Sequence, residues 1–196
     1  MKSVSDEIKI EKAKKKDINE LVNLIYITEP EPEEEWGYGG ENRRKENLKE
    51  LLAKKNNRFS IENIIVARKG KELVGMLLYL EGNKIDKLTQ KSEEYVSEQQ
   101  NGIISKLGFK FLGILDKLFC KECEEDEFYL SNLAVKEEFR GNHYSELIIN
   151  KAYELARKKG YKKASLLAKN EKLIKFYNKI GYKLVDRRIR KMVISI

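Results

Sequence analysis

The chain has 196 residues, of which 41% are hydrophobic and 37% are charged, and its formal net charge is +8. This length suits one full hydrophobic core, so we expect a single domain over residues 1–196. No apolar run approaches the roughly 20 residues of a membrane span, and the N-terminus lacks the apolar segment of a secretory signal. We therefore expect a cytoplasmic protein. The basic residues are dispersed and form no nucleic-acid-binding motif, so the charge alone does not indicate a nucleic-acid partner.

Cys120 and Cys123 form one C-x-x-C pair, and His143 is the only histidine. A closed zinc site needs four ligands, so the pair is insufficient within one chain and we expect no metal site. A redox role lacks the thioredoxin-like context that usually accompanies it. We favour two reduced thiols without a catalytic role.

The first 55 residues predict a strand and two helices. Alternating isoleucines at 8–10 predict the strand, and Asp17 with Glu20 resembles a capping box at the start of a helix. The stretch 29–35 carries five glutamates and two prolines, which predicts an acidic loop that proline keeps out of helix. Leucines at helical spacing predict the second helix over 44–55.

Residues 61–67 and 73–80 are apolar and are joined by a turn that contains Gly70, which predicts a hairpin. Residues 84–120 read as helical, with a broad apolar stripe over 103–119. The stripe has three interpretations: it covers the sheet, it forms a homodimer interface, or it lies on a membrane surface. We favour the first, and the dimer is next.

The region 128–160 predicts a strand, a turn and a helix. Residues 128–135 are mostly apolar and indicate a buried strand, and apolar residues recur at helical spacing from Tyr144 until Gly160 ends the helix. The intervening turn contains Gly141. Such a connection directs free backbone N–H groups and the positive end of a helix dipole outward, which suits a diphosphate. The turn has neither the Lys-Ser/Thr of a P-loop nor the three glycines of a dinucleotide fingerprint.

Three signatures in this order resemble the Gcn5-related N-acetyltransferase (GNAT) family. Arg140 matches the first position of the family's Arg/Gln-x-x-Gly-x-Gly/Ala turn, where His143 and Ser145 replace the usual small residues. Downstream, a second signature of Asn, Phe-Tyr and Gly-aromatic is matched by Asn170, Phe176, Tyr177, Gly181 and Tyr182. Upstream, the hairpin around Gly70 matches the family's third core strand.

The resemblance implies an α/β fold with a mixed, mostly antiparallel central sheet flanked by helices. Strands over 164–168, 182–185 and 191–196 and a short helix over 173–180 complete it. In the family a short turn joins the third and fourth core strands, so residues 84–120 would be a helical insertion.

The resemblance also implies that acetyl-coenzyme A lies between the fourth and fifth core strands. Its pantetheine arm would pair with the backbone of Leu133, Ala134 and Val135, as if it added a strand. The pyrophosphate would be held by the turn, and two residues of the second signature would complete the site: Arg140, Gly141, Asn142, His143, Tyr144, Ser145, Asn170 and Phe176.

His143 is the unusual residue in this turn. A left-handed backbone there would cost of order 1 kcal/mol, although histidine is among the residue types enriched in it. Its imidazole would either assist phosphate binding or lie exposed on the surface.

Tyr177 matches the family's general acid. A phenol has a pKa of about 10 and a thiol about 8.5, so full proton transfer is uphill by ~2 kcal/mol. We therefore expect Tyr177 to donate a hydrogen bond to developing negative charge; the alternative is a core tyrosine. The base is not evident, since Ser131 occupies the position of a glutamate in polyamine-acetylating relatives. Water, Glu35 or Glu127 would relay the proton instead.

The sequence therefore predicts an N-acetyltransferase that moves an acetyl group from acetyl-coenzyme A to a primary amine, on a small molecule or a lysine, by direct attack. The alternatives are a non-catalytic acyl-coenzyme A-binding module and a transferase of longer acyl groups. The acidic runs 29–35 and 124–127 would concentrate a cationic amine if they met at the acceptor opening. The alternative is two solvated loops that do not meet.

Overall fold

The computed structural model of the protein describes residues 7–100 and 121–196. Its strands are β1 (Ile8–Lys12), β2 (Ile64–Lys69), β3 (Glu72–Glu81), β4 (Glu127–Val135), β5 (Lys163–Leu167), β6 (Lys183–Asp186) and β7 (Lys191–Ser195). Its α-helices are α1 (Ile18–Tyr26), α2 (Pro32–Trp36), α3 (Glu41–Ala53), α4 (Ile85–Glu98), α6 (Tyr144–Lys158) and α7 (Glu171–Lys179).

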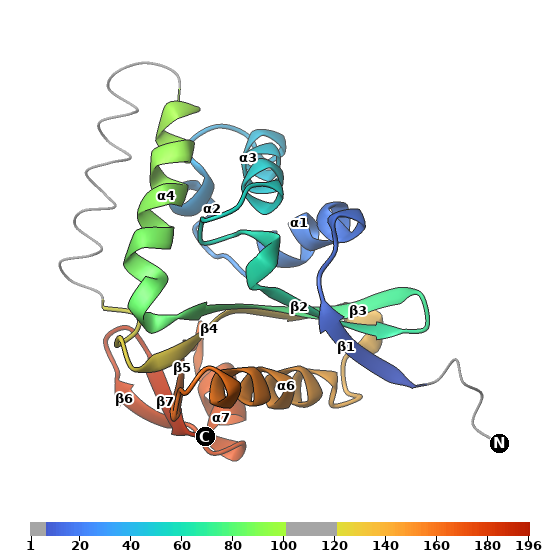
Figure 1. The fold of residues 1–196 in the computed structure, drawn as a ribbon, viewed down its shortest axis with the longest axis vertical. Helices are drawn as coiled ribbons and strands as arrows, with labels where there is room; N and C mark the ends of the chain where they lie inside the picture. Colours follow the sequence, from blue (N-terminus) through green and yellow to red (C-terminus); the bar gives the residue numbers. More distant parts are fainter. Residues whose placement is uncertain (1–6, 101–120) are drawn as a thin grey trace.

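The described strands form one sheet in the order β1-β2-β3-β4-β5-β7-β6. Of the pairings between them, only β4 with β5 is parallel. Helices α1, α3 and α4 lie on one side of the sheet, and α6 and α7 lie on the other (Figure 1). This confirms the expected α/β fold with a mixed, mostly antiparallel sheet between helices.

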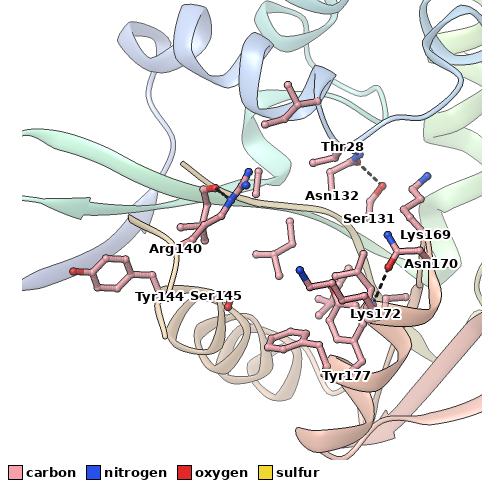
Figure 2. A pocket seen from close by; sticks show the side chains of 18 of the residues that line it. Thr28, Ser131, Asn132, Arg140, Tyr144, Ser145, Lys169, Asn170, Lys172 and Tyr177 are labelled. Atoms are coloured by element: carbon pink, nitrogen blue, oxygen red, sulfur yellow. Dashed lines mark hydrogen bonds between the residues drawn. The ribbon is translucent and has the colours of Figure 1, made fainter. Parts of the chain in front are cut away.

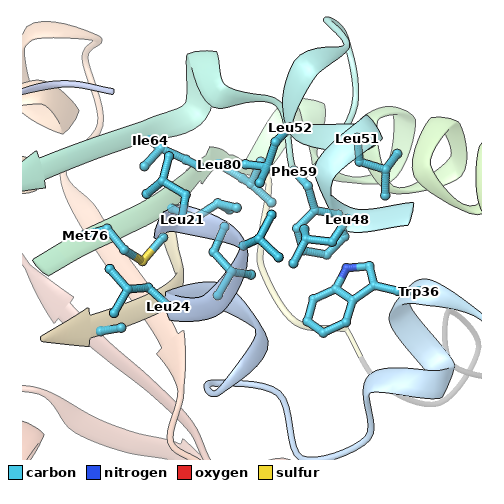
Figure 3. Packing of buried hydrophobic residues seen from close by; sticks show 14 of the residues in the cluster. Leu21, Leu24, Trp36, Leu48, Leu51, Leu52, Phe59, Ile64, Met76 and Leu80 are labelled. Atoms are coloured by element: carbon cyan, nitrogen blue, oxygen red, sulfur yellow. The ribbon is translucent and has the colours of Figure 1, made fainter. Parts of the chain in front are cut away.

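Each face of the sheet has its own hydrophobic core. On the first face Trp36 is fully buried, stacks on Tyr26 with ring centroids 5.2 Å apart and meets Phe59 edge-on at 5.7 Å. Leucines of α1 and α3 pack around it and onto β2 and β3 (Figure 3). The core of the second face contains Ile148 of α6 and Tyr177 of α7. The apolar alternation within β2 to β4 supplies both cores.

The acidic stretch 29–35 is not a loop throughout, because residues 32–36 form helix α2. Pro32 occupies the start of that helix, where a missing N–H breaks no hydrogen bond. The glutamates that follow lie in the first turn, where the helix dipole favours negative charge. The next helix begins at Glu41 and ends at Ala53, three and two residues before the expected bounds.

Asp17 does not cap α1 as expected. Its side chain makes no capping hydrogen bond and is 2% exposed. One carboxylate oxygen lies 2.6 Å from Arg68 Nη2 and accepts a hydrogen bond from the Lys14 N–H at 2.8 Å. Arg68 also contacts Glu11 at 3.1 Å. A buried ion-pair network therefore joins the segment before α1 to strand β2.

Helix α4 confirms the helical start of the stretch 84–120, whereas residues 101–120, including the apolar stripe and Cys120, lie outside the described residues. The expected strand 61–67 begins later, because Ser60 caps a short 3-10 turn before β2. Cys123 is a buried free thiol, and burial raises its pKa to about 12. In the described ranges no His, Cys, Asp and Glu side chains cluster as a metal site would require, and no helix there could cross a membrane.

Candidate functional site

The two parallel strands separate about a third of the way along β4. Bridge pairs run from Glu127 with Lys163 to Tyr129 with Ser165 and go no further. A pocket of about 620 Å³ opens where the strands diverge. Residues 130–135 of β4 and 166–167 of β5 line it, together with the turn before α6 and one face of α7. The β4 edge that faces the pocket is therefore free to pair with an extended ligand.

A β-bulge shapes the middle of β4. Leu78 of β3 pairs with Asn132, but the next residue pairs with Leu130, so Ser131 is the extra residue. A bulge bends and twists its strand, and bulges are common beside functional sites. The Ser131 side chain lines the pocket and donates a hydrogen bond to Asn132 Oδ1 at 2.8 Å.

The turn before α6 presents unused hydrogen-bond donors. Gly141 has φ +83° and His143 has φ +60°, so both adopt the left-handed conformation, as considered for His143. Within the described chain, the backbone N–H groups of residues 141–146 donate no hydrogen bond. These donors lie at the positive end of a 15-residue helix. The arrangement favours an anion at this end of the pocket.

Most of the residues predicted for the cofactor site line this pocket. They are Leu133, Ala134, Val135, Arg140, Gly141, His143, Tyr144, Ser145, Asn170 and Phe176, and Tyr177 joins them. Asn142 does not, because its side chain turns back to donate to the Phe139 carbonyl at 3.1 Å. His143 lies 2.8 Å from Glu146 and its side chain is 77% exposed. Asn170 Oδ1 accepts from the Leu173 N–H at 3.0 Å and so caps α7.

The charged side chains that line the pocket are all basic: Arg140, Lys169 and Lys172, and the imidazole of His143 also lines it. The two lysines belong to none of the family signatures in the sequence. Lys169 ends the segment after β5 and lies 3.3 Å from Glu29, and Lys172 lies in the first turn of α7. The sequence signal that could have indicated them is their position beside Asn170. Asn170 caps the start of α7 at the pocket, so residues next to it also reach the edge of the pocket.

Tyr177 projects from α7 into the pocket and is 8% exposed. Among the described residues its hydroxyl has no hydrogen-bond partner, so it is free to donate to a ligand. Burial, with a smaller contribution from Tyr153, raises the pKa of Tyr177 to about 12. Figure 2 shows Arg140 and Tyr144 on one side of the pocket, Thr28, Asn132 and Ser131 on the other, and Tyr177 below them.

A hydrogen-bond network supports the Ser131 end of the pocket. Asn132 donates to Thr28 Oγ1 at 2.8 Å, and Arg58 donates to the Ser131 hydroxyl at 3.3 Å. Arg58 is 5% exposed, and its guanidinium donates hydrogen bonds to both carboxylate oxygens of Glu122, at 3.1 and 2.8 Å. Although burial opposes ionisation, the Arg58 guanidinium lowers the pKa of Glu122. No local sequence pattern predicts this network, because its members lie up to 104 residues apart.

Glu35, at the end of α2, interacts with the same charges. Burial is the main cause that raises the pKa of Glu35 to about 7; Glu29 and Glu122 also raise it, while Arg58 and Lys169 lower it. Glu35 does not line the pocket itself, but Lys169 does. Three carboxylates and two cations therefore gather at the Ser131 end.

The second acidic run is elsewhere. Glu127 is 4% exposed and lies 3.0 Å from Lys191, and Asp126 lies 2.8 Å from Lys163. None of residues 124–127 lines the pocket. The two acidic runs therefore do not meet at its opening, and Glu127 is not placed to relay a proton there.

The acetyltransferase (GNAT) family model matches residues 21–182. No curated protein matches the sequence. An N-acetyltransferase from Staphylococcus aureus has a TM-score of 0.69 at 19% identity, covering 95% of this chain and 100% of that one. The PaiA N-acetyltransferase from Thermoplasma acidophilum, in complex with coenzyme A, has a TM-score of 0.55 at 16% identity, covering 97% and 99%. The polyamine N-acetyltransferase of Drosophila melanogaster has a TM-score of 0.58 at 13% identity, covering 97% and 100%. These similarities concern the fold.

Proposed function

Because the chain belongs to the acetyltransferase (GNAT) family, we propose that it is an N-acetyltransferase that uses acetyl-coenzyme A and acetylates a primary amine. The observation that carries the proposal is one pocket with three matched parts. These are an open strand edge over residues 130–135, a helix N-terminus with unused N–H groups, and the buried free hydroxyl of Tyr177.

The pocket suits two parts of coenzyme A, the diphosphate and the pantetheine arm. The N–H groups of residues 141–146 and the side chains of Arg140 and Lys172 would hold the diphosphate. The open edge of Leu133–Val135 would pair with the amides of the pantetheine arm. The pocket lining carries no carboxylate to repel these phosphates. Bound acetyl-coenzyme A supplies an acetyl group activated as a thioester.

Tyr177 would stabilise the departing sulfur. The amine nitrogen attacks the carbonyl carbon, the carbon–sulfur bond breaks, and its electron pair stays on sulfur. A phenol of pKa about 12 cannot readily protonate a thiolate whose conjugate acid has a pKa near 8.5, since the transfer is uphill by about 5 kcal/mol. The Tyr177 hydroxyl therefore acts as a hydrogen-bond donor to sulfur and keeps its proton.

Glu35 would take the proton that the amine must lose. From an ammonium group of pKa about 10.4, transfer to an ordinary glutamate is uphill by about 8 kcal/mol, but to a carboxylate of pKa about 7 by about 5 kcal/mol. Because Glu35 lies behind the pocket wall, the proton would pass through water beside Ser131. This assigns the relay to Glu35 and leaves Glu127 in its ion pair with Lys191.

The acceptor would be a basic amine. The carboxylates of Glu29, Glu35 and Glu122 outnumber the cations of Arg58 and Lys169 at the Ser131 end, which favours a cationic substrate. Two proteins with the same fold are a polyamine N-acetyltransferase and an agmatine N-acetyltransferase, which supports small basic amines as the first to test.

Two measurements test the function. Calorimetric titration should detect coenzyme A binding, and an amine panel with acetyl-coenzyme A should reveal turnover. Tyr177→Phe should lower kcat about 10- to 150-fold, the loss of a charge-assisted hydrogen bond of about 1.5–3 kcal/mol, with the acetyl-coenzyme A KM nearly unchanged. The matched control is Tyr161→Phe, whose hydroxyl bonds Asn83 outside the pocket. Binding without turnover for any amine would favour a non-catalytic acyl-coenzyme A-binding module.

A further inference from the structure

A chain of side-chain hydrogen bonds runs along the pocket wall at the Ser131 end. Arg58 Nη2 lies 3.3 Å from the Ser131 hydroxyl, which lies 2.8 Å from Asn132 Oδ1. The Asn132 amide nitrogen lies 2.8 Å from Thr28 Oγ1, which lies 2.6 Å from the carbonyl oxygen of Ile25. Figure 2 shows Thr28, Asn132 and Ser131 beside one another on this wall. The chain therefore joins the residues that follow α1 to the bulge in β4.

The two ends of this chain fix the direction of every hydrogen bond in it. A carbonyl oxygen can only accept, so Thr28 donates its one hydroxyl proton to Ile25. Thr28 Oγ1 must then accept from Asn132, whose amide turns its nitrogen to Thr28 and its oxygen to Ser131. Ser131 must therefore donate its own proton to Asn132 Oδ1. At the other end a guanidinium can only donate, so Ser131 Oγ accepts from Arg58.

Neither hydroxyl keeps a proton for a ligand. A hydroxyl oxygen has two lone pairs, and each of these two oxygens accepts one side-chain hydrogen bond, Ser131 from Arg58 and Thr28 from Asn132. One acceptor position therefore remains on each oxygen. Thr28 and Ser131 line the pocket and are partly exposed, whereas Asn132 is 5% exposed. This wall thus offers a ligand two hydroxyl groups that can accept a hydrogen bond and cannot donate one.

The Arg58 end of the chain is held in place. The Arg58 guanidinium donates to both carboxylate oxygens of Glu122, and its Nη1 also lies 3.3 Å from Thr89 Oγ1. A guanidinium stays protonated at any ordinary pH, so Arg58 cannot turn from donor to acceptor. The direction of the hydrogen bonds along the wall is therefore a constant property of this pocket.

We propose that Thr28 and Ser131 are specificity-determining residues whose hydroxyl oxygens accept hydrogen bonds from N–H groups of the acceptor amine. The inference rests on the proposed function. A primary amine has two N–H donors when neutral and three when protonated, so it matches a wall that only accepts. The lone pair of the neutral nitrogen stays free to attack the thioester carbon. Because the Ser131 proton is already donated to Asn132, the proton that the amine loses passes to water beside Ser131 and not to Ser131 itself.

The test separates hydrogen bonding from attraction by charge. Butylamine at pH 7 and butyltrimethylammonium carry the same charge, but only butylamine has N–H groups. Both are measured as competitive inhibitors against the best acceptor of the amine panel, at saturating acetyl-coenzyme A. Thr28→Val and Ser131→Ala should each weaken inhibition by butylamine about tenfold, equivalent to about 1.4 kcal/mol. Inhibition by butyltrimethylammonium and the KM for acetyl-coenzyme A should change less than about twofold.

Two further variants serve as controls. Thr28→Ser keeps the hydroxyl and should retain the wild-type inhibition by butylamine. Thr89→Val makes the same substitution as Thr28→Val at a hydroxyl that also accepts from Arg58 but does not line the pocket. It should leave both inhibition constants unchanged. Melting temperatures measured for all four variants identify any loss that comes from unfolding.

The possible results separate this inference from the proposed function. If the wild type acetylates amines but Thr28→Val and Ser131→Ala weaken both inhibitors equally, or neither, the role of the two hydroxyls is overturned and the function stands. The role is also overturned if Thr28→Ser loses as much butylamine inhibition as Thr28→Val. If wild-type protein turns over no amine, the proposed function and this inference fall together.

Discussion

Glu35→Gln should remove a pH-dependent step from the reaction. Glu35 has a pKa of about 7, raised by burial and by its carboxylate neighbours. A proton acceptor must be ionised, so the wild-type kcat should rise with pH through about 7 and level off above it. Glutamine cannot accept the proton, and its kcat at pH 8 should be about 100-fold lower, the smaller end of the usual range for a general base.

The difference between variant and wild type should itself depend on pH. At pH 5, two pH units below its pKa, only about 1% of Glu35 is ionised, so the 100-fold advantage of the wild type over Glu35→Gln should shrink to about twofold. Steady-state kcat at saturating acceptor, measured from pH 5 to 9, gives both curves. Glu33→Gln, on the same short helix, is the control and should keep the wild-type profile.

Glu122→Gln tests the cause of the raised pKa. It removes a carboxylate that raises the pKa of Glu35 and leaves Arg58, which lowers it. The rise in kcat should therefore move to lower pH. A Glu35→Gln variant that retains the rise near pH 7 would refute Glu35 as the proton acceptor. A shift to higher pH in Glu122→Gln would refute the account of its pKa.

Four further outcomes follow from features outside this step. Asp17→Ala should lower the free energy of unfolding by about 3 kcal/mol in urea titrations, because it strips the buried Arg68 of one partner; no loss would remove that network from the stability of the fold. His143→Gly should raise the free energy of unfolding by about 1 kcal/mol, since glycine relieves the left-handed strain at φ +60°, and should keep the affinity for coenzyme A within about twofold. Iodoacetamide at pH 8 should label Cys123 in unfolded but not native protein, as seen by mass spectrometry, because burial raises its pKa to about 12. The KM of a cationic acceptor should rise from low to physiological ionic strength, and an unchanged KM would exclude electrostatic steering by the carboxylates.

Local patterns predicted the parts of the molecule that are local in sequence. The strand, turn and helix around Gly141 are coded within about 30 residues, and the Phe176–Tyr177 helix with its closing Gly181 within about 12. Their bounds moved by only one or two residues, because apolar periodicity marks the buried faces directly. The pocket residues that lie on these segments could therefore be predicted from the sequence.

Contacts between distant segments were not available in the same way. Arg58 meets Glu122 across 64 residues, and Thr28 meets Asn132 across 104. No periodicity relates such pairs, since the sheet order and not the chain brings them together. Asp17 shows the same limit in reverse: a locally convincing cap was replaced by a stronger, buried partner from β2.

Because the contact between β4 and β5 is short, we expect the two parts of the sheet on either side of it to unfold with little cooperativity in the free protein. Strands β1 to β4 and strands β5 to β7 are joined edge to edge by three bridge pairs alone. An extended ligand in the gap, such as the pantetheine arm, would connect these two parts of the sheet through hydrogen bonds along most of the length of β4. At a concentration of 100 times its Kd, such a ligand adds about 2.7 kcal/mol of stability, and this gain should appear first at the loosest boundary of the sheet. The backbone amides of residues 130–135 that point into the gap should therefore exchange with deuterium as if at a sheet edge in the free protein, and as if in a sheet centre once coenzyme A is bound; the amides that pair with β3 should be protected in both states.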